Sequence, residues 1–120
     1  MSTFVITQRF NDKYKFEYTS RKGKTIFTSN LYELQFECAN AIEYFKNNID
    51  LASFLKSKSS SGKFFFRLII NEKQFAVSRK YSTILMLEKG IADITKYAFN
   101  SETIDFSKNS LVFEDIDFDA

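Results

Sequence analysis

The feature that most constrains the fold of this chain is an internal repeat. Starting at Lys13 the chain reads KYKFEYTSRKGKTIFTSNLY, and starting at Lys63 it reads KFFFRLIINEKQFAVSRKY. Each copy is followed by a helix-like stretch in which a small residue precedes an isoleucine, at Ala41-Ile42 and at Gly90-Ile91. One copy alone is too small to bury its apolar face well, so the repeat predicts two units packed as one pseudo-symmetric domain.

Alternation of apolar and polar residues predicts the strands of both units. The expected strands span residues 3–8, 13–19, 25–29, 54–58, 63–70, 74–79 and 102–107. Apolar residues at helical spacing predict an amphipathic helix from Leu34 to Ile49 and a second one that begins near Ser82, a suitable N-cap. Ile42 and Ile91 are expected to be buried counterparts, each between a helix and the sheet.

The length and composition suit one domain. The chain has 120 residues, 44% of them hydrophobic, and no proline that would mark a linker. We expect a single domain over residues 1–107, with repeat one at 3–50 and repeat two at 53–107, followed by an acidic C-terminal extension at 108–120. Residues 101–120 contain six acidic residues and one lysine, a net charge of −5, so residues 1–100 carry +7.

The sequence also predicts where the protein resides. It contains no apolar run of about 18 residues that would cross a membrane, and its N-terminus lacks the pattern of a signal peptide. Its one cysteine, Cys38, cannot form an intramolecular disulfide, which is typical of a reducing compartment. We therefore expect a cytoplasmic protein without a membrane partner.

Few residues are suited to catalysis or metal binding. The chain has no histidine, and one cysteine cannot build a zinc or iron–sulfur site. Two Ser-x-x-Lys matches, at residues 53–56 and 60–63, fall on a predicted strand and turn and not at a helix start. Cys38 lies on the apolar stripe of the first helix, which predicts an inert thiol. The acidic cluster at 114–119 lacks the glycine and the final glutamate of an EF-hand, which favours a solvated tail. We expect no catalytic residue, no cofactor and no metal.

One face of the predicted sheet is a candidate binding surface. In the second unit, Phe64, Phe66, Leu68 and Ile70 should face the helices, which leaves the intervening residues on the opposite side. An aromatic side chain between cations is how some RNA-binding sheets stack bases. The candidate residues on this face are Lys13, Lys15, Lys63, Phe65 and Arg67. Three other interpretations are a covered sheet, a self-association patch and tolerated surface hydrophobic residues.

The order of these motifs resembles the YegP-like family of tandem-repeat proteins. The matching residues are Lys13 to Phe16, Gly23, Ser29 to Tyr32 and Ala41-Ile42, then Lys63 to Phe66, Asn71, Ser78 to Tyr81 and Gly90-Ile91. The resemblance covers Thr3 to about Ser107. It implies an α+β fold of two β-β-β-α repeats that form one antiparallel sheet, with both helices on one face and the C-terminal strands exchanged between repeats. It implies no activity, because the family is uncharacterised. Two departures are Ala41, where the family has glycine, and the acidic extension.

Together these observations favour a non-enzymatic binding or protein-interaction module whose partner is a protein. The alternative is a weak nucleic-acid-binding domain that uses the basic and aromatic sheet face, and a small hydrolase or oxidoreductase ranks third. The sequence leaves open whether the protein is a monomer or a homodimer.

Overall fold

The structure of the protein is a computed structural model that describes residues 1–107; the acidic extension predicted at 108–120 lies outside the described residues. Seven strands and two α-helices follow one another in the predicted order. They are β1 (Thr3–Gln8), β2 (Tyr14–Thr19), β3 (Thr25–Ser29), α1 (Gln35–Asn47), β4 (Ser53–Lys58), β5 (Phe64–Ile70), β6 (Lys73–Ser78), α2 (Ile84–Tyr97) and β7 (Glu102–Asp105). Short 3-10 helices, η1 (Ile49–Leu51) and η2 (Ala98–Asn100), follow the two α-helices.

All seven strands belong to one sheet, in the order β4-β5-β6-β3-β2-β1-β7. The pair at its centre is β3 and β6, which brings the first and the second half of the chain into direct contact. Neighbouring strands run antiparallel throughout the described part of the chain, except that β7 runs parallel to β1. The structure thus confirms an α+β fold with one sheet and two helices, and it adds one parallel pair to the expected antiparallel sheet.

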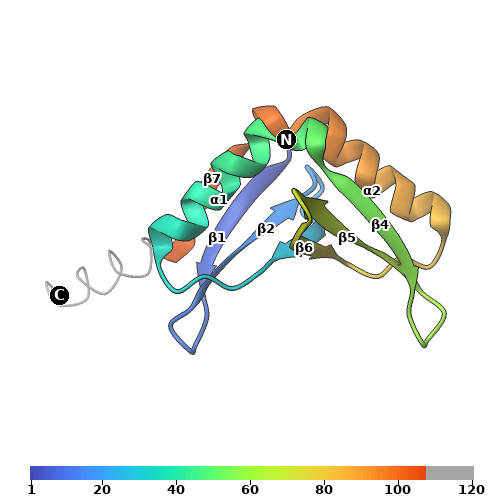
Figure 1. Cartoon of the computed structure of the whole chain (residues 1–120), viewed down its shortest axis with the longest axis horizontal. Helices are drawn as coiled ribbons and strands as arrows, with labels where there is room; N and C mark the ends of the chain where they lie inside the picture. Colours follow the sequence, from blue (N-terminus) through green and yellow to red (C-terminus); the bar gives the residue numbers. More distant parts are fainter. Residues whose placement is uncertain (108–120) are drawn as a thin grey trace, which may run out of the picture.

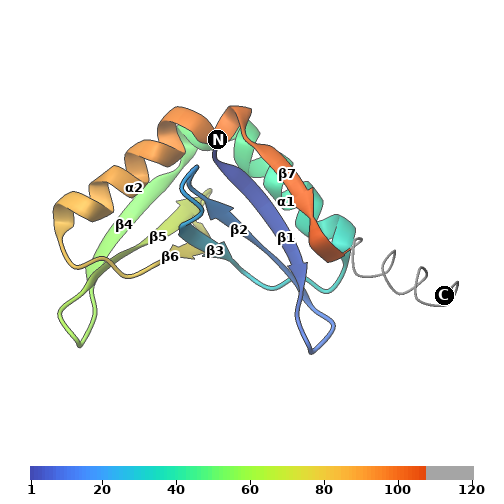
Figure 2. The same cartoon turned by 180° about the vertical axis from the view of Figure 1, so that it is seen from behind.

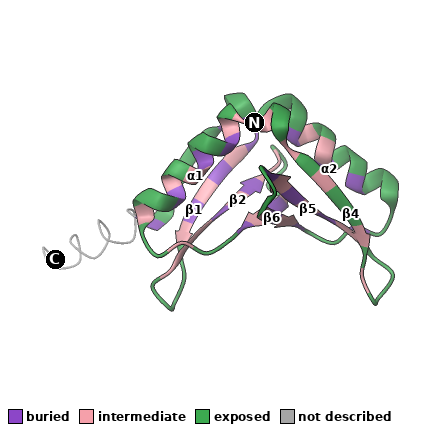
Figure 3. Ribbon diagram, in the orientation of Figure 1, coloured by how far each residue is buried: buried purple, intermediate pink, exposed green. Residues whose placement is uncertain are grey.

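The helices lie along the upper, outer side of the arched sheet, and the β1–β2 and β4–β5 turns extend from the strand ends at its two lower ends (Figures 1 and 2). Buried residues gather between the helices and the strands, whereas the outer helix surfaces are exposed (Figure 3). None of the helices within residues 1–107 is both long enough and apolar enough to cross a bilayer.

The turns after β2 and β5 differ in length and in backbone conformation: the first spans residues 20–24 and the second residues 71–72. Gly23 has a φ of +83° in the β2–β3 turn, a conformation that glycine adopts without steric cost. In the β5–β6 turn, Asn71 and Glu72 both have positive φ, 52° and 67°, as in the two-residue turns that suit the twist of a hairpin. The longer first turn contains two exposed lysines, Lys22 and Lys24.

The second helix departs from the sequence prediction in two ways. Its N-cap is Thr83, not Ser82, and the Thr83 side chain accepts a hydrogen bond from the Met86 backbone amide at 3.1 Å. Ile91 is only partly buried, so the prediction that it matches the fully buried Ile42 is wrong. The buried position is Gly90, where an added Cβ would lie 2.5 Å from the Tyr81 hydroxyl oxygen. This close approach places Gly90 directly against Tyr81, and Ile91 packs at the margin of the core.

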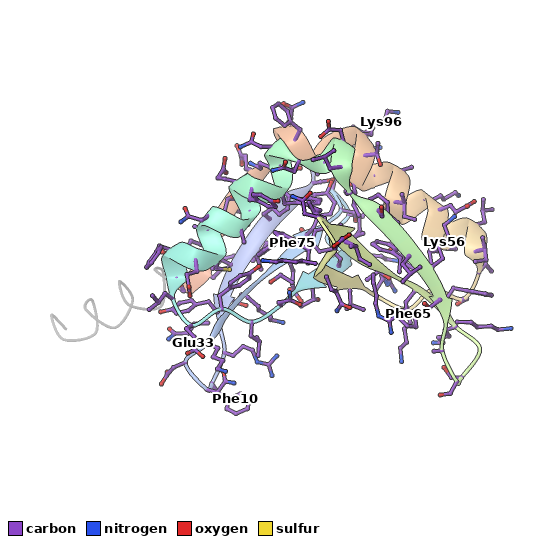
Figure 4. All side chains as sticks on the ribbon, viewed as in Figure 1. Phe10, Glu33, Lys56, Phe65, Phe75 and Lys96 are labelled. Atoms are coloured by element: carbon purple, nitrogen blue, oxygen red, sulfur yellow. The ribbon has the colours of Figure 1, made fainter. Side chains whose placement is uncertain are left out.

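The core joins both halves of the sheet through aromatic contacts. The Phe45 ring on α1 lies 6.0 Å from Phe4 on β1 and 5.6 Å from Phe27 on β3 (centroid distances). It also stacks on Phe75 of β6 at 5.9 Å. Phe75 lies in the middle of the molecule (Figure 4), so a residue from the second half of the chain completes the core under the first helix.

Candidate functional site

The open sheet face is the side of the sheet that no helix covers. Strand pairing places one residue from each of six strands in a row across it: Val5, Glu17, Thr28, Val77, Arg67 and Leu55. The neighbours of these residues along the strands, such as Phe4 and Leu68, point the other way and are buried. In contrast, Leu55 is 52% exposed and the other five residues of the row are partly buried.

Phe65 and Arg67 form the most distinctive contact on the open sheet face. The Arg67 guanidinium carbon lies 5.2 Å from the centre of the Phe65 ring, within the range of a cation–π contact. The same guanidinium donates a long hydrogen bond, 3.4 Å, to the Ser57 hydroxyl. Phe65 lies below β5, on the side away from α2 (Figure 4). These two residues, which the sequence singled out, therefore lie together on one accessible surface.

The three predicted lysines do not add to one basic surface. The Lys13 ammonium lies 3.3 Å from a Glu33 carboxylate oxygen, and the Lys15 ammonium lies 3.4 Å from Glu17. Lys63 is exposed and stands just after the β4–β5 turn. Nearby carboxylates thus pair with Lys13 and Lys15, and Arg67 is the cation at the centre of the open sheet face.

A second feature, which the sequence did not reveal, is a groove beside α2. It has a volume of about 380 Å³ and lies between the β2–β3 turn, the end of β6 and the second helix. We call it the basic groove because four cations line it: Lys22, Lys24, Arg79 and Lys89. No sequence motif indicates it, because its cations come from three segments that only the folded sheet brings together.

The wall of the basic groove is held by hydrogen bonds to Asp93. One oxygen of the Asp93 carboxylate accepts hydrogen bonds from the Tyr18 hydroxyl at 2.6 Å and the Ser2 hydroxyl at 3.0 Å. Burial, together with this carboxylate, raises the pKa of Tyr18, so the phenol stays protonated and keeps donating. Burial also raises the pKa of Tyr81, against the opposing charge of Arg79, so a second protonated hydroxyl lines the groove.

A larger cavity, about 570 Å³, lies between the C-terminal ends of the two helices. Its charged lining residues are Lys46 and Asp50, one of each sign. Its remaining lining residues are Asn47, Ile49, Ala52, Phe54, Thr95 and Phe99. This mixed lining points to no ligand class.

Cys38 occupies the interior position that its place in the sequence predicts. Its side chain is fully buried on α1. Burial, with a smaller contribution from the negative charge of Asp105, raises the pKa of the thiol to about 12 from 9.0. The thiol is therefore protonated at neutral pH, which is the state of an unreactive cysteine.

We expect alkaline pH to destabilise the protein partly through Cys38. The folded state keeps the thiol protonated while the unfolded thiol ionises from a pKa near 9.0, so stability is lost as the pH rises from about 9 to about 12. In that window the free energy of unfolding should fall more steeply for the native protein than for Cys38→Ala, by about 1.4 kcal/mol per pH unit. Urea denaturation at several pH values measures the difference. Parallel curves for the two proteins would contradict it.

Comparisons with known proteins give relatives in sequence and in fold. No family model matches the chain. It is 28% identical to the UPF0339 protein YegP of Escherichia coli O6:H1 over 103 residues, which cover 84% of this chain and 93% of that protein. It is also 28% identical to YegP of Escherichia coli K12 over 93 residues, 76% of this chain and 84% of that protein.

Two solution NMR structures share the fold. YegP from Escherichia coli, itself described as a protein of unknown function, aligns with a TM-score of 0.77 at 24% identity and covers 88% of this chain and 93% of its own. A UPF0339 protein from Shewanella oneidensis aligns with a TM-score of 0.78 at 23% identity, over 88% of this chain and 92% of its own. The chain is therefore similar to YegP in sequence over most of its length and has the fold of these two structures.

Proposed function

We propose that the chain is a YegP-like tandem repeat that works as a non-enzymatic protein-binding module. Hydrogen bonds that recur at an interval of 49 or 50 residues support the repeat. Tyr14 and Tyr32 exchange backbone hydrogen bonds at 2.8 and 2.7 Å, and Phe64 and Tyr81 do so at the same two distances. This duplicated bridge joins the start of the second strand of each unit to the segment before its helix.

A second duplicated feature involves a buried serine at the end of each unit's third strand. The Ser29 hydroxyl accepts a hydrogen bond from the Phe16 amide at 2.9 Å, and the Ser78 hydroxyl accepts one from the Phe66 amide at 2.9 Å. Each hydroxyl then donates to the carbonyl of the next residue. In each unit a serine side chain satisfies a buried strand amide, and the recurrence of this bond at equivalent places supports a common origin of the two units.

The sheet topology supports an exchange for one of the two strands. β4 follows α1 in the chain but opens the predicted second repeat, 53–107, and it pairs with β5 of that same repeat. β7 follows α2 at the end of the second repeat but pairs with β1 of the first. The β7–β1 pair therefore ties the repeats into one body.

The single observation that carries the binding function is the Phe65–Arg67 pair on the open sheet face. Apolar side chains flank it, with Leu55 paired to Arg67 on one side and Val77 on the other. Aromatic side chains, phenylalanine among them, and arginine are enriched in the cores of protein interfaces relative to the rest of the surface. A partner segment with apolar side chains around one carboxylate would satisfy both the ring and the guanidinium, so we assign the face to a protein with an acidic and apolar docking segment.

The chemistry of the chain supports a role without catalysis. It has no histidine, and the thiol of Cys38 is buried and protonated. A nucleic-acid partner, the alternative, would use Phe65 as a stacking platform. It would find two of the predicted lysines already paired with Glu33 and Glu17. The protein partner therefore fits the open sheet face better.

The test compares partner recovery by two double variants. Phe65→Ala with Arg67→Ala should weaken binding of protein partners in a cell extract about 30-fold, the effect of removing a hot spot of about 2 kcal/mol. The matched control, Lys96→Ala with Phe99→Ala, removes an exposed cation and an exposed aromatic ring at the end of α2 and should bind normally.

Nuclease treatment of the same extract separates the two functions. Protein binding should survive nuclease and depend little on salt, because few phosphate counterions are released. If nuclease removes the recovered material, or if both double variants behave alike, the protein-binding function is wrong.

A further inference from the structure

The basic groove is assembled from both halves of the chain. The β2–β3 turn contributes Lys22 and Lys24, and the end of β6 contributes Arg79. The second helix contributes Lys89 and the buried Gly90. Figure 2 shows this turn between the two halves of the molecule, near α2. The groove lies on the helix side of the sheet, so it is separate from the open sheet face.

The lining of the groove has a clear excess of positive charge. Its four cations face one carboxylate, that of Asp93, and none of the four forms an ion pair with another residue in the described part of the chain. The carboxylate already accepts two hydrogen bonds from hydroxyl groups. Several unpaired cations around one concavity raise the local concentration of anions.

Beside the first helix, side chains fill the place that corresponds to the basic groove. There the Tyr44 ring stacks on Phe75 with a centroid distance of 6.0 Å, and the Asn71 side-chain amide donates a 2.6 Å hydrogen bond to the Tyr44 hydroxyl. On the repeat alignment proposed above, Tyr44 corresponds to Asp93 and Phe75 to Ile26. The smaller side chains of Asp93 and Ile26 thus leave a space beside α2 that Tyr44 and Phe75 fill beside α1.

Two of the four cations are also particular to that side. On the same alignment, Arg79 corresponds to Asn30 and Lys89 to Asn40, so two cations of the groove have neutral counterparts. The position of Gly90 matters as well, because a side chain there would meet the Tyr81 hydroxyl. An open, cationic groove therefore distinguishes the second helix from the first.

We propose that the basic groove binds a small molecule bearing a diphosphate or similar phosphate group. The volume of about 380 Å³ is that of a small ligand site, which spans roughly 300–1,000 Å³ in proteins. The four cations line one concavity, the shape of a site for a small ligand. Arg79 supplies a planar donor fork for phosphate oxygens, and the lysines supply point charges. The protonated Tyr81 hydroxyl is a further donor.

The test is a titration of the isotope-labelled full chain with inorganic pyrophosphate, at constant ionic strength, followed by amide NMR shifts. We expect saturable shifts at Lys24, Tyr81 and Gly90. Arg79→Gln with Lys89→Gln should weaken binding by at least about tenfold, since two charged hydrogen-bond donors to the phosphate oxygens are removed. The matched control is Lys58→Gln with Lys63→Gln, which removes two exposed lysines beside the β4–β5 turn. It should bind as the native protein does.

A variant of opposite sign keeps the test independent of folding. Asp93→Asn retains the oxygen that accepts from Tyr18 and Ser2 but removes the negative charge, so it should tighten pyrophosphate binding several-fold. Loss of fold cannot produce a gain in affinity.

Two results would overturn the proposal. One is the absence of saturable pyrophosphate shifts in the groove, including the case in which a single-stranded oligonucleotide shifts these amides and pyrophosphate does not. The other is equal weakening by the groove and control variants. Phe65→Ala with Arg67→Ala should not change pyrophosphate binding, so this result is independent of the protein-binding function.

Discussion

Replacing Phe45 with alanine is expected to lower the free energy of unfolding by about 3–5 kcal/mol, the range for removing a large aromatic side chain from a core. The side chain is fully buried, and its ring contacts Phe4, Phe27 and Phe75. Those three rings belong to β1, β3 and β6, which come from both halves of the sheet. The cavity left by Phe45→Ala would therefore weaken the first helix and the contact between the halves together.

Phe36→Ala is the matched control for this prediction. Phe36 lies on the same helix but is 59% exposed, so its replacement should change stability by no more than about 0.5 kcal/mol. Urea denaturation followed by circular dichroism measures both, and the midpoint should move for Phe45→Ala without a change of slope. Similar losses for the two variants would mean that the aromatic contacts around Phe45 do not stabilise the fold.

The secondary structure was largely predictable from the sequence, because alternation and helical spacing report directly which faces are apolar. The strand expected at 25–29 is β3, Thr25–Ser29, and the one expected at 54–58 is β4, Ser53–Lys58. The helix expected from Leu34 begins at Gln35. The final strand ends earlier than expected, at Asp105 and not at residue 107.

The rotation of the second helix about its own axis, which decides the residues that face the sheet, was not predictable. Helical spacing marks Gly90, Ile91 and Ile94 as one stripe, but it does not say which of them points most directly at the sheet. The Tyr81 hydroxyl fills the space over Gly90, so the helix presents Gly90 and Ile94 inward and leaves Ile91 partly exposed. A tertiary contact between residues nine positions apart decided this, and periodicity contains no such information.

The candidate site was only partly predictable, for a similar reason. Phe65 and Arg67 lie two residues apart on one strand, so their shared face follows from the period of a strand. Lys13 and Lys15 fall on the expected strand as well, but their carboxylate partners Glu33 and Glu17 became visible only in the fold. The cations of the basic groove come from separate segments that long-range strand pairing brings together, so the sequence contained no local sign of them.

The two halves of the chain are expected to be unable to fold alone. Residues 1–52 on their own would lose the pairing of β3 with β6 and of β1 with β7. They would also lose the Phe75 ring that covers Phe45. A domain of about 60 residues buries only about 60% of its unfolded surface, which leaves little stability to spare. The unpaired strand edges would also be free to pair with another chain.

Both proposed surfaces require the two halves to be folded together. The open sheet face spans the β3–β6 pair, and the basic groove has cations from each half. Size-exclusion chromatography with light scattering, combined with circular dichroism, tests this requirement on residues 1–52 and 53–107, with residues 1–107 as the control. We predict that each half is either largely unfolded or a homodimer that restores the missing strand pairs between two copies. A compact monomer of either half that unfolds cooperatively would contradict the single interdependent sheet.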